Sequence, residues 1–331
     1  MDSKSTQSMS AYVINEPGGA EKLIRCDVPV PACAQGSVLI RIRALGLNRS
    51  EWFTRRGESP NVKFPRVLGI ECVGEVADGG GTDLGVGQTV AAMMGGMGRD
   101  FDGSYAQYTS VPRANVFALN TQLPWQAIAA LPETLQTVHG SLYTALQIDR
   151  ADNILIRGGS SSIGLAAIAL SQYAGLTVTA TTRDPTKQAQ LQSAGAARVL
   201  IDNGNIHDAA RALYPEGFDC VLELIGTSTL VDSLRTARRG GIVCMTGILG
   251  GEWSLRDFRP MDDVPTAVSL TSYSGNASDI SELQLQRYVE MIEFGDLTLK
   301  SAIVFPFSEL ADAHRLMDSN TANAKIVILV D

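Results

Sequence analysis

The sequence predicts an α/β protein built from a doubly wound parallel sheet and a β-rich, barrel-like second domain. Three observations lead to this prediction. A glycine-serine turn lies between an apolar strand at 153–157 and a small-residue, apolar helix at 163–174. Strands and helices alternate from there to about residue 246, as they do in a parallel sheet covered by helices. The first 120 residues instead carry short β-branched runs broken by Gly and Pro, which is typical of antiparallel strands.

The turn between strand and helix reads Gly158-Gly-Ser-Ser-Ser-Ile-Gly164. Two of its glycines occupy the first and last positions of the GxGxxG fingerprint, and a serine takes the middle position. At a helix N-terminus the backbone N–H groups and the positive end of the helix dipole face outward together, which favours a phosphate. A further strand at 177–182 follows at the spacing of a β-α-β unit. The stretch therefore predicts a Rossmann-type dinucleotide site made of Gly159, Ser160, Ser161, Ser162, Ile163 and Gly164.

The three serine hydroxyls of this turn are expected to donate to phosphate oxygens. The plainer alternative is a Gly/Ser turn that only joins a strand to a helix, and the flanking elements argue against it.

The remaining elements follow from hydrophobic patterning and turn signals. In the parallel sheet we expect strands at 153–157, 176–182, 197–201, 218–224 and 241–246, and helices near 163–174, 185–194, 206–213 and 227–238. Helices at 125–131 and 134–147 lead into the sheet. The β-rich part has clear strands at 38–44, 72–77 and 88–92. The last sixty residues contain helices at 279–294 and 308–317, a strand near 302 and a final strand at 325–330.

These elements suggest a domain division. Because the parallel sheet is already complete, most of the C-terminal segment is assigned back to the β-rich domain. The predicted domains are a β-rich catalytic domain at 10–124 and 276–331 and a cofactor domain at 125–275. Residues 1–9, polar and rich in Ser and Thr, are expected to form a disordered tail.

Composition excludes several classes of function. Of the 331 residues, 45% are hydrophobic and 19% are charged, and the net charge is −8. An acidic chain lacks the basic footprint of a protein that binds nucleic acid or an acidic membrane. No apolar run reaches the roughly 18 residues of a membrane span. Five cysteines without a CxxC pair, and no signal-peptide pattern, predict a reducing, cytoplasmic location.

Several further motifs occur in a fixed order along the chain. They are Gly46-Leu-Asn48, Arg56-Gly57, the segment 65–76 (Pro-Arg-Val-Leu-Gly-Ile-Glu-Cys-Val-Gly-Glu-Val), Phe101–Tyr108 and Ala129–Thr137. Together with the glycine turn, they make the chain similar to the medium-chain dehydrogenase/reductase superfamily, in its zinc-independent, quinone oxidoreductase-like branch. The similarity covers nearly the whole chain. It implies NADPH-dependent hydride transfer to a quinone or to the C=C bond of an α,β-unsaturated carbonyl.

The resemblance also implies a homodimer, in which strands corresponding to 267–271 pair edge to edge. An unprotected edge strand favours such pairing.

The positions of the superfamily's zinc ligands are occupied by other residues. Zinc-dependent members carry a Cys where Asn48 stands and a His where Ile70 stands, and the stretch from Gly95 to Val111 contains no Cys. Catalytic zinc needs three protein ligands, and the three histidines of this chain are widely spaced. We therefore expect no metal.

Other site residues are assigned by the resemblance. Asn48 and Thr137 match positions beside the nicotinamide and its ribose, although a turn Asn and a helix Thr would be ordinary there. The backbone of Gly247, Ile248 and Leu249 matches a segment that lines the nicotinamide. Lys325 matches the Lys of a Gly-Lys pair but lacks its Gly.

The resemblance assigns no proton donor to this chain. Related enoyl reductases carry a Tyr where this chain has Ser59. We consider Tyr105 as the replacement, with a packed loop tyrosine and protonation by water as the alternatives.

The end of the second parallel strand indicates the cofactor. An NAD site needs an acid there to bind the ribose 2′-OH, whereas a 2′-phosphate needs cations. Asp184 precedes Pro185 and is explained as a helix N-cap. Arg183 and Lys187, with the hydroxyl of Thr182, can bind a phosphate. The sequence therefore predicts NADPH.

The alternative is that Asp184 holds the ribose and the two cations are solvated. The family's usual Tyr beside the adenine is replaced here by Asp202.

Three other functions share features with this sequence. A short-chain dehydrogenase is disfavoured, since no Tyr has a Lys four residues on and about 150 residues precede the turn. A trans-acting enoyl reductase of a biosynthetic pathway and a non-catalytic NADPH-binding regulatory or structural protein stay open, because a fold does not determine a function.

Overall fold

The computed structural model describes residues 7–331, and the chain divides into two compact units. Unit 1 comprises residues up to 133 together with 276–293 and 301–331, and unit 2 comprises 134–275 and 294–300. Compared with the predicted division, 125–133 joins unit 1 and 294–300 joins unit 2. Helix α2 (Trp125–Ile128) explains the first difference, because it contacts strands β3, β5 and β16 of unit 1.

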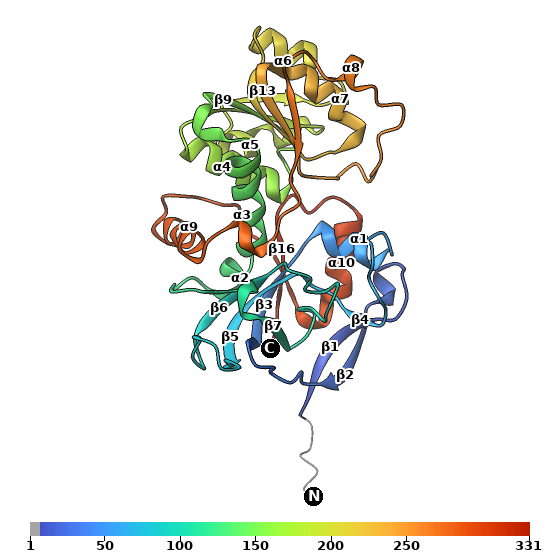
Figure 1. Cartoon of the computed structure of the whole chain (residues 1–331), viewed down its shortest axis with the longest axis vertical. Helices are drawn as coiled ribbons and strands as arrows, with labels where there is room; N and C mark the ends of the chain where they lie inside the picture. Colours follow the sequence, from blue (N-terminus) through green and yellow to red (C-terminus); the bar gives the residue numbers. More distant parts are fainter. Residues whose placement is uncertain (1–6) are drawn as a thin grey trace, which may run out of the picture. The chain divides into compact units, whose positions relative to one another are not determined.

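Unit 1 is built on two sheets (Figure 1). The smaller sheet is antiparallel and has the order β2 (Ile24–Pro29), β1 (Ser8–Ile14), β4 (Arg66–Val67). The larger has seven strands: β15 (Ile303–Pro306), β16 (Ile326–Leu329), β3 (Ser37–Leu47), β5 (Glu71–Asp78), β6 (Thr89–Met93) and β8 (Val116–Ala118) in that order, with β7 (Tyr108–Pro112) also paired to β3. The start of β1 corrects the predicted tail, since Ser8 and Met9 belong to a strand. The rest of the tail, up to residue 6, lies outside the described residues.

The strands predicted for the β-rich part are confirmed as β3, β5 and β6. Alternation in β3 places Val38, Ile40 and Ile42 in the core while Arg41 is exposed, as a half-buried strand requires. The final strand β16 runs antiparallel to β3, with Ile326 opposite Leu47. This pairing brings the end of the chain back into unit 1.

The helices of unit 1 are short except near the C-terminus. They are α1 (Arg49–Arg55), α2, α9 (Glu282–Phe294) and α10 (Leu310–Asp318), of which α9 and α10 correspond to the two predicted C-terminal helices. The last residue of α9, Phe294, groups with unit 2. Buried residues of β1, β3, β5 and β16 form the hydrophobic core with Leu310 and Ala313 of α10.

Unit 2 is a six-stranded parallel sheet with the order β11 (Arg198–Ile201), β10 (Thr177–Thr182), β9 (Asn153–Arg157), β12 (Phe218–Glu223), β13 (Ala237–Met245) and β14 (Ser269–Ser272). Counted along the unit, this is the order 3-2-1-4-5-6 of the dinucleotide-binding doubly wound fold. The five strands expected from the sequence are confirmed. The sixth, β14, lies at the edge of the sheet and overlaps the segment 267–271 that the resemblance assigned to an edge strand.

The helices of unit 2 connect the parallel strands (Figure 1). They are α4 (Ser162–Tyr173), α5 (Gln188–Ser193), α6 (His207–Leu213), α7 (Thr227–Thr236) and α8 (Pro260–Asp263). Helices α4 and α5 contact β9, β10 and β11, whereas α7 packs on β12 and β13 and on α6. The predicted helix at 134–147 is α3 (Pro132–His139) followed by a π-helical turn at Gly140–Ala145.

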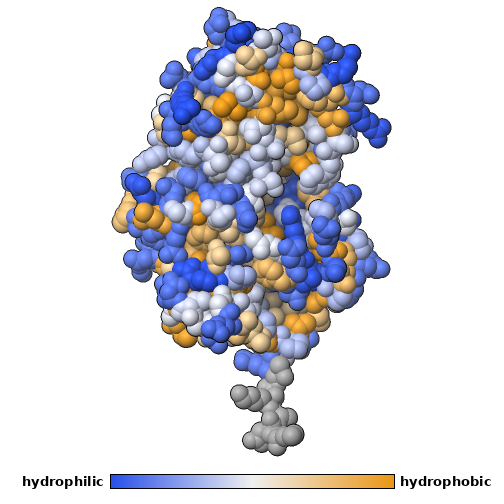
Figure 2. Space-filling view, in the orientation of Figure 1, coloured by the Kyte–Doolittle hydropathy of each residue, from blue (hydrophilic) through white to orange (hydrophobic). Residues whose placement is uncertain are grey.

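The surface mixes hydrophilic and hydrophobic residues on the face that Figure 2 shows. Within residues 7–331, no helix has the length and apolarity that crossing a membrane requires.

Candidate functional site

The glycine turn of unit 2 is held against the neighbouring strand β10. The N–H of Gly159 donates to the carbonyl of Thr181 at 3.0 Å. A Cβ atom on Gly159 would stand only 2.9 Å from the Cβ of Ala180, and one on Gly164 would overlap the carbonyl oxygen of Gly158. Both ends of the fingerprint therefore need glycine, because helix α4, strand β9 and strand β10 approach each other closely here.

Ser161 has a different role from the predicted one. It is the N-cap of α4, where its hydroxyl accepts from the N–H of Gly164 at 3.0 Å and donates to the carbonyl of Gly158 at 2.8 Å. Its proton is used inside the turn, so a contact to phosphate would have to replace this hydrogen bond, and the contact stays a prediction. Ser160, Ser162 and Ile163 are partly exposed at the start of α4, where the first N–H groups have no acceptor within the helix.

The end of β10 arranges its charges as the sequence predicted. Asp184 caps the 3₁₀ turn at 185–187, accepting from the N–H of Thr186 at 3.0 Å and from its hydroxyl at 2.6 Å. These hydrogen bonds lower the pKa of Asp184. Its interpretation as an N-cap is confirmed. Arg183 is exposed beside it, Lys187 is partly exposed one turn on, and Thr182 is buried.

Asp202 is bound within unit 2 by Arg157, the last residue of β9. The guanidinium holds both carboxylate oxygens, with Nε to Oδ2 at 2.8 Å and Nη2 to Oδ1 at 2.9 Å. Burial favours a higher pKa for Asp202, but the hydrogen bonds and charge of Arg157 keep it below its ordinary value. Arg157 also binds Asp232 at 2.7 Å. Asp202 therefore serves a buried ion-pair network.

The segment after β13 is fixed by the neighbouring strand end. The N–H groups of Gly247 and Leu249 donate to the carbonyls of Glu223 and Leu224, both at 3.1 Å. Ile248 lies between them. These backbone groups stand at the carboxyl edge of the parallel sheet, where ligands of doubly wound folds bind.

Thr137 lies on α3 and is linked to this edge through Ser141. The Ser141 hydroxyl donates to the Thr137 carbonyl at 2.7 Å and lies 2.9 Å from the hydroxyl of Thr246, the residue after β13. Residues predicted from separate motifs thus meet within unit 2.

Asn48 of unit 1 belongs to a buried polar cluster. It is the N-cap of α1, and the pairing of β16 with β3 places Lys325 opposite it. The Lys325 ammonium donates to the Asn48 side-chain oxygen and forms ion pairs with Glu71 at 2.7 Å and Glu133 at 3.2 Å. The Asn48 amide nitrogen donates to Glu71 at 2.9 Å. The side chain of Asn48 is therefore engaged on both sides within unit 1.

The acidic members of this cluster were not assigned from the sequence. Glu51 accepts from the N–H groups of Asn48 and Ile70, both at 3.1 Å, and burial raises its pKa to about 8. Burial disfavours the charged form of Lys325, but Glu71 and Glu133 together raise its pKa above the ordinary value. The pattern Asn-x-x-Glu at 48–51 is the sequence signal of the capping box.

Tyr105 is completely buried in the core of unit 1. Its hydroxyl lies 2.8 Å from Nε2 of His314. Burial raises the pKa of Tyr105 and lowers that of His314 to about 3. This environment disfavours Tyr105 as a proton donor to a ligand, because its hydroxyl faces a neutral imidazole in the protein interior. Tyr105 is a packed core tyrosine in this structure, which agrees with the first alternative.

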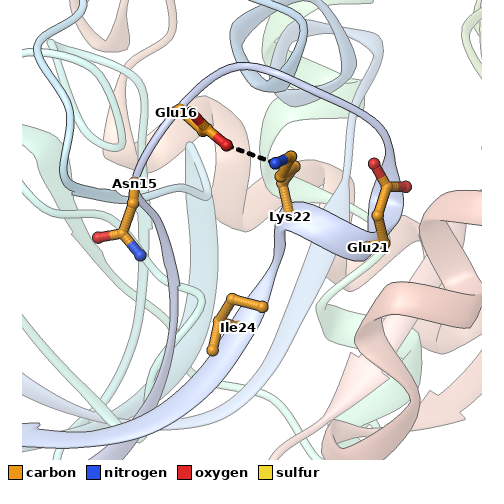
Figure 3. Close-up of a pocket in the computed structure, with 5 residues that line it drawn as sticks. All are labelled: Asn15, Glu16, Glu21, Lys22 and Ile24. Atoms are coloured by element: carbon orange, nitrogen blue, oxygen red, sulfur yellow. Dashed lines mark hydrogen bonds and ion pairs between the residues drawn. The ribbon is translucent and has the colours of Figure 1, made fainter.

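Unit 1 also has a hollow of about 320 Å³ on its surface, lined by Asn15, Glu16, Glu21, Lys22 and Ile24 (Figure 3). Lys22 pairs with Glu16, and Glu21 accepts from the N–H of Gly19 at 3.1 Å. None of the predicted site residues lines it. Across residues 7–331, no three His, Cys, Asp or Glu side chains are grouped so as to hold a metal ion.

Comparisons with known proteins agree with this architecture. Residues 34–121 match the family model of the alcohol dehydrogenase GroES-like domain, and residues 194–328 match that of the zinc-binding dehydrogenase. The quinone oxidoreductase of Lama guanicoe is 26% identical over 335 residues, covering 97% of this chain and 98% of the relative. Prostaglandin reductase-3 of Mus musculus is 28% identical over 290 residues, covering 83% of this chain and 74% of the relative.

Among solved structures, that of a mycobacterial protein complexed with NADPH is similar with a TM-score of 0.85 at 22% identity, over 97% of this chain and 99% of that chain. The two-domain fold is therefore shared.

Proposed function

Because the chain belongs to the medium-chain dehydrogenase/reductase superfamily, in its quinone oxidoreductase-like branch, we propose that it uses NADPH to reduce a quinone or the C=C bond of an α,β-unsaturated carbonyl, without zinc. The relatives that support these two substrate classes are a quinone oxidoreductase and a prostaglandin reductase. The cofactor when bound would supply the hydride, and the protein's part is to bind and orient the reactants.

The observation that carries the proposal is the glycine turn at the start of α4. A Cβ at Gly159 or Gly164 would collide with β10 or with the turn itself, so these glycines allow the close packing that holds the N-terminus of α4 at the carboxyl edge of the sheet, where a pyrophosphate would bind. Ser160, Ser162 and Ile163 would hold the phosphates there through backbone N–H groups. Thr137, Gly247, Ile248 and Leu249 would contact the nicotinamide half.

The choice of NADPH rests on the end of β10. The carboxylate of Asp184 is already used as a cap, which leaves the exposed Arg183 as the group best placed to bind a 2′-phosphate. Lys187 is its proposed second cation. The NADPH complex of the mycobacterial protein with the same fold supports this choice.

The proposal that no zinc is used rests on the groups present at the ligand positions. Asn48 and Ile70 offer neither a thiolate nor an imidazole. The Lys325 ammonium donates to Asn48, and a cation bound at this place would be repelled by it.

One experiment tests the activity and the cofactor together. Oxidation of NADPH and of NADH is followed by absorbance with a panel of quinones and enones, using protein whose metal content has been measured after dialysis. We expect turnover with NADPH, a weaker response with NADH and no stoichiometric zinc. Binding of NADPH without turnover of any acceptor would instead favour the non-catalytic regulatory or structural protein.

A biosynthetic enoyl reductase acting in trans is the second enzymatic candidate. The similarity to prostaglandin reductase-3 favours the enone arm of the proposal. Preference for a carrier-bound or thioester enone over free quinones in the same panel would identify this candidate.

We further propose that the protein acts in the cytoplasm as a homodimer that pairs through β14. Within residues 7–331 this strand pairs on one side only, with β13, and Leu270 is 40% exposed on it. Light scattering is expected to give twice the 35.3 kDa of the chain. A particle of one chain at micromolar concentration would contradict this assembly.

A further inference from the structure

We propose that Tyr273 is the proton donor of the reduction and that Gln136 positions its hydroxyl. The inference rests on the proposed reductase function and names a residue of unit 2 that neither the motifs nor the resemblance singled out. Reduction of an enone needs a proton as well as a hydride, and the structure disfavours Tyr105 as its source because the side chain is completely buried.

The position of Tyr273 is the first argument. It follows β14 directly, and its N–H donates to the carbonyl of Met245 at the end of β13, at 3.0 Å. Since the two strands are parallel, Tyr273 stands at the same carboxyl edge as Thr246 and the proposed nicotinamide segment 247–249. Ligands of doubly wound sheets bind at this edge.

The second argument is that the hydroxyl is held in place. The side-chain nitrogen of Gln136 donates to the Tyr273 hydroxyl oxygen at 2.6 Å. Gln136 is completely buried, so its amide has little freedom to turn away. A Cβ atom at residue 140 would coincide with the ring end of Tyr273, so Gly140 leaves the space that the hydroxyl occupies. Gln136 and Gly140 lie four residues apart, about one helical turn, so both stand on the helix face that meets this hydroxyl.

The third argument is chemical. A neutral amide N–H that donates to the phenol oxygen stabilises the phenolate left after the proton departs. The Tyr273 residue is partly exposed, and in this proposal its phenolate is reprotonated from solvent after each turnover. Tyr105, by contrast, meets an imidazole in the core of unit 1.

The proton and electron balance is simple. The hydride adds to the β-carbon of the enone, the C=C π electrons move to the α-carbon and carbonyl oxygen, and the Tyr273 O–H bond breaks to give its proton to the resulting enolate. The phenolate then takes a proton from water. The oxidised cofactor and the saturated ketone are the products.

The first test compares the wild type with Tyr273→Phe on the full chain, with cyclohex-2-enone as acceptor and saturating NADPH. We expect kcat to fall roughly 10²- to 10⁴-fold, the range for loss of a general acid. Binding of NADPH, measured separately by fluorescence titration, should be unchanged. Tyr143→Phe is the matched control, because Tyr143 is another partly buried tyrosine of unit 2, stacked on His139, and its loss should leave kcat unchanged.

The second test addresses Gln136 by a titration that needs no turnover and by the pH dependence of kcat. Carbon-13 NMR of ζ-labelled tyrosine in the cofactor-free protein identifies the Tyr273 signal by its loss in Tyr273→Phe. In Gln136→Met this signal should titrate at higher pH than in the wild type, because the phenolate has lost a donor. The fall of kcat on the alkaline side should move in the same direction, which a merely structural defect would not produce.

The outcomes separate this inference from the proposed function. An active wild type with an equally active Tyr273→Phe variant would overturn the inference alone. So would equal losses of NADPH binding and kcat, which would make Tyr273 a cofactor contact. Unchanged titration in Gln136→Met would overturn the role of Gln136. A wild type that reduces no quinone or enone would overturn the proposed function and this inference with it.

Discussion

The Lys325 cluster of unit 1 and the turns that follow β9 and β10 in unit 2 hold their polar groups in different environments. In unit 1, Lys325, Glu71 and Glu133 are paired with one another in the interior. In unit 2, Ser160 and Ser162 after β9 are partly exposed and Arg183 after β10 is exposed. The difference indicates that a substitution in the buried cluster should change mainly stability, whereas one at the exposed turns should change mainly ligand binding. The parallel strands of unit 2 all end at the edge that carries these turns, where ligands bind in doubly wound folds.

The largest effect should come from breaking the buried cluster of unit 1. Lys325→Met removes the ammonium that pairs with Glu71 and Glu133, and the completely buried Glu71 carboxylate loses its ion pair. We expect the free energy of unfolding to fall by about 3–5 kcal/mol. Denaturant titration measures it. Arg315→Ala is the control, because Arg315 pairs with Asp312 on the exposed surface, and it should cost less than about 1 kcal/mol.

A loss on the order of 1 kcal/mol or less in Lys325→Met would show that the cluster is no more costly to break than a surface pair.

The next largest effect should be on NADPH affinity, through Arg183 after β10 of unit 2. Arg183→Ala should weaken NADPH binding by roughly 1.5–3 kcal/mol, the range for a hydrogen bond to a charged group, and leave NADH binding almost unchanged. Calorimetry with both cofactors measures the difference. Equal losses for both cofactors, or a wild-type preference for NADH, would remove Arg183 from the proposed phosphate site.

The buried carboxyl group of Glu51 in unit 1 should make the stability of the protein depend on pH. The pKa of Glu51 is raised from 4.5 to about 8 in the folded protein, so between these values the native state holds a proton that the unfolded chain releases. Stability due to Glu51 is therefore greatest below the lower value and falls as pH rises toward the upper one, by at most about 1.4 kcal/mol per pH unit. Glu51→Gln, which mimics the protonated acid, should flatten this slope.

Unfolding free energies of the two proteins at several pH values from 5 to 8 test this prediction, and parallel curves would contradict it.

The smallest effect tests the hydroxyl of Ser161. Because it caps α4 internally, Ser161→Ala should cost about 1 kcal/mol of stability and change NADPH affinity little. Thermal unfolding and NADPH titration measure the two quantities. Ser160→Ala is the matched control in the same turn. A large loss of NADPH affinity with unchanged stability in Ser161→Ala would support its predicted contact to phosphate.

The sequence by itself determined where the strands, helices and helix caps of unit 2 lie along the chain. Apolar runs between Gly and Pro located β9 to β13 and the helices between them, because period and turn chemistry act over a few residues. The cap formed by Asp184 before Pro185 was also readable, since donor and acceptor lie two residues apart. The glycines of the α4 turn were identified for the same reason.

Only the tertiary structure decided which distant side chains meet. Lys325 reaches Glu71 because β16 pairs with β3. Asp202 binds Arg157 because β11 and β9 lie on either side of β10 in one parallel sheet and end at the same edge. Tyr273 and Gln136 lie 137 residues apart, and no pattern in either segment predicts their hydrogen bond. Such contacts depend on how whole elements pack, which no short pattern encodes. Burial is decided in the same way, so the sequence could name Tyr105 as a candidate acid while only the packed core showed that its hydroxyl faces His314.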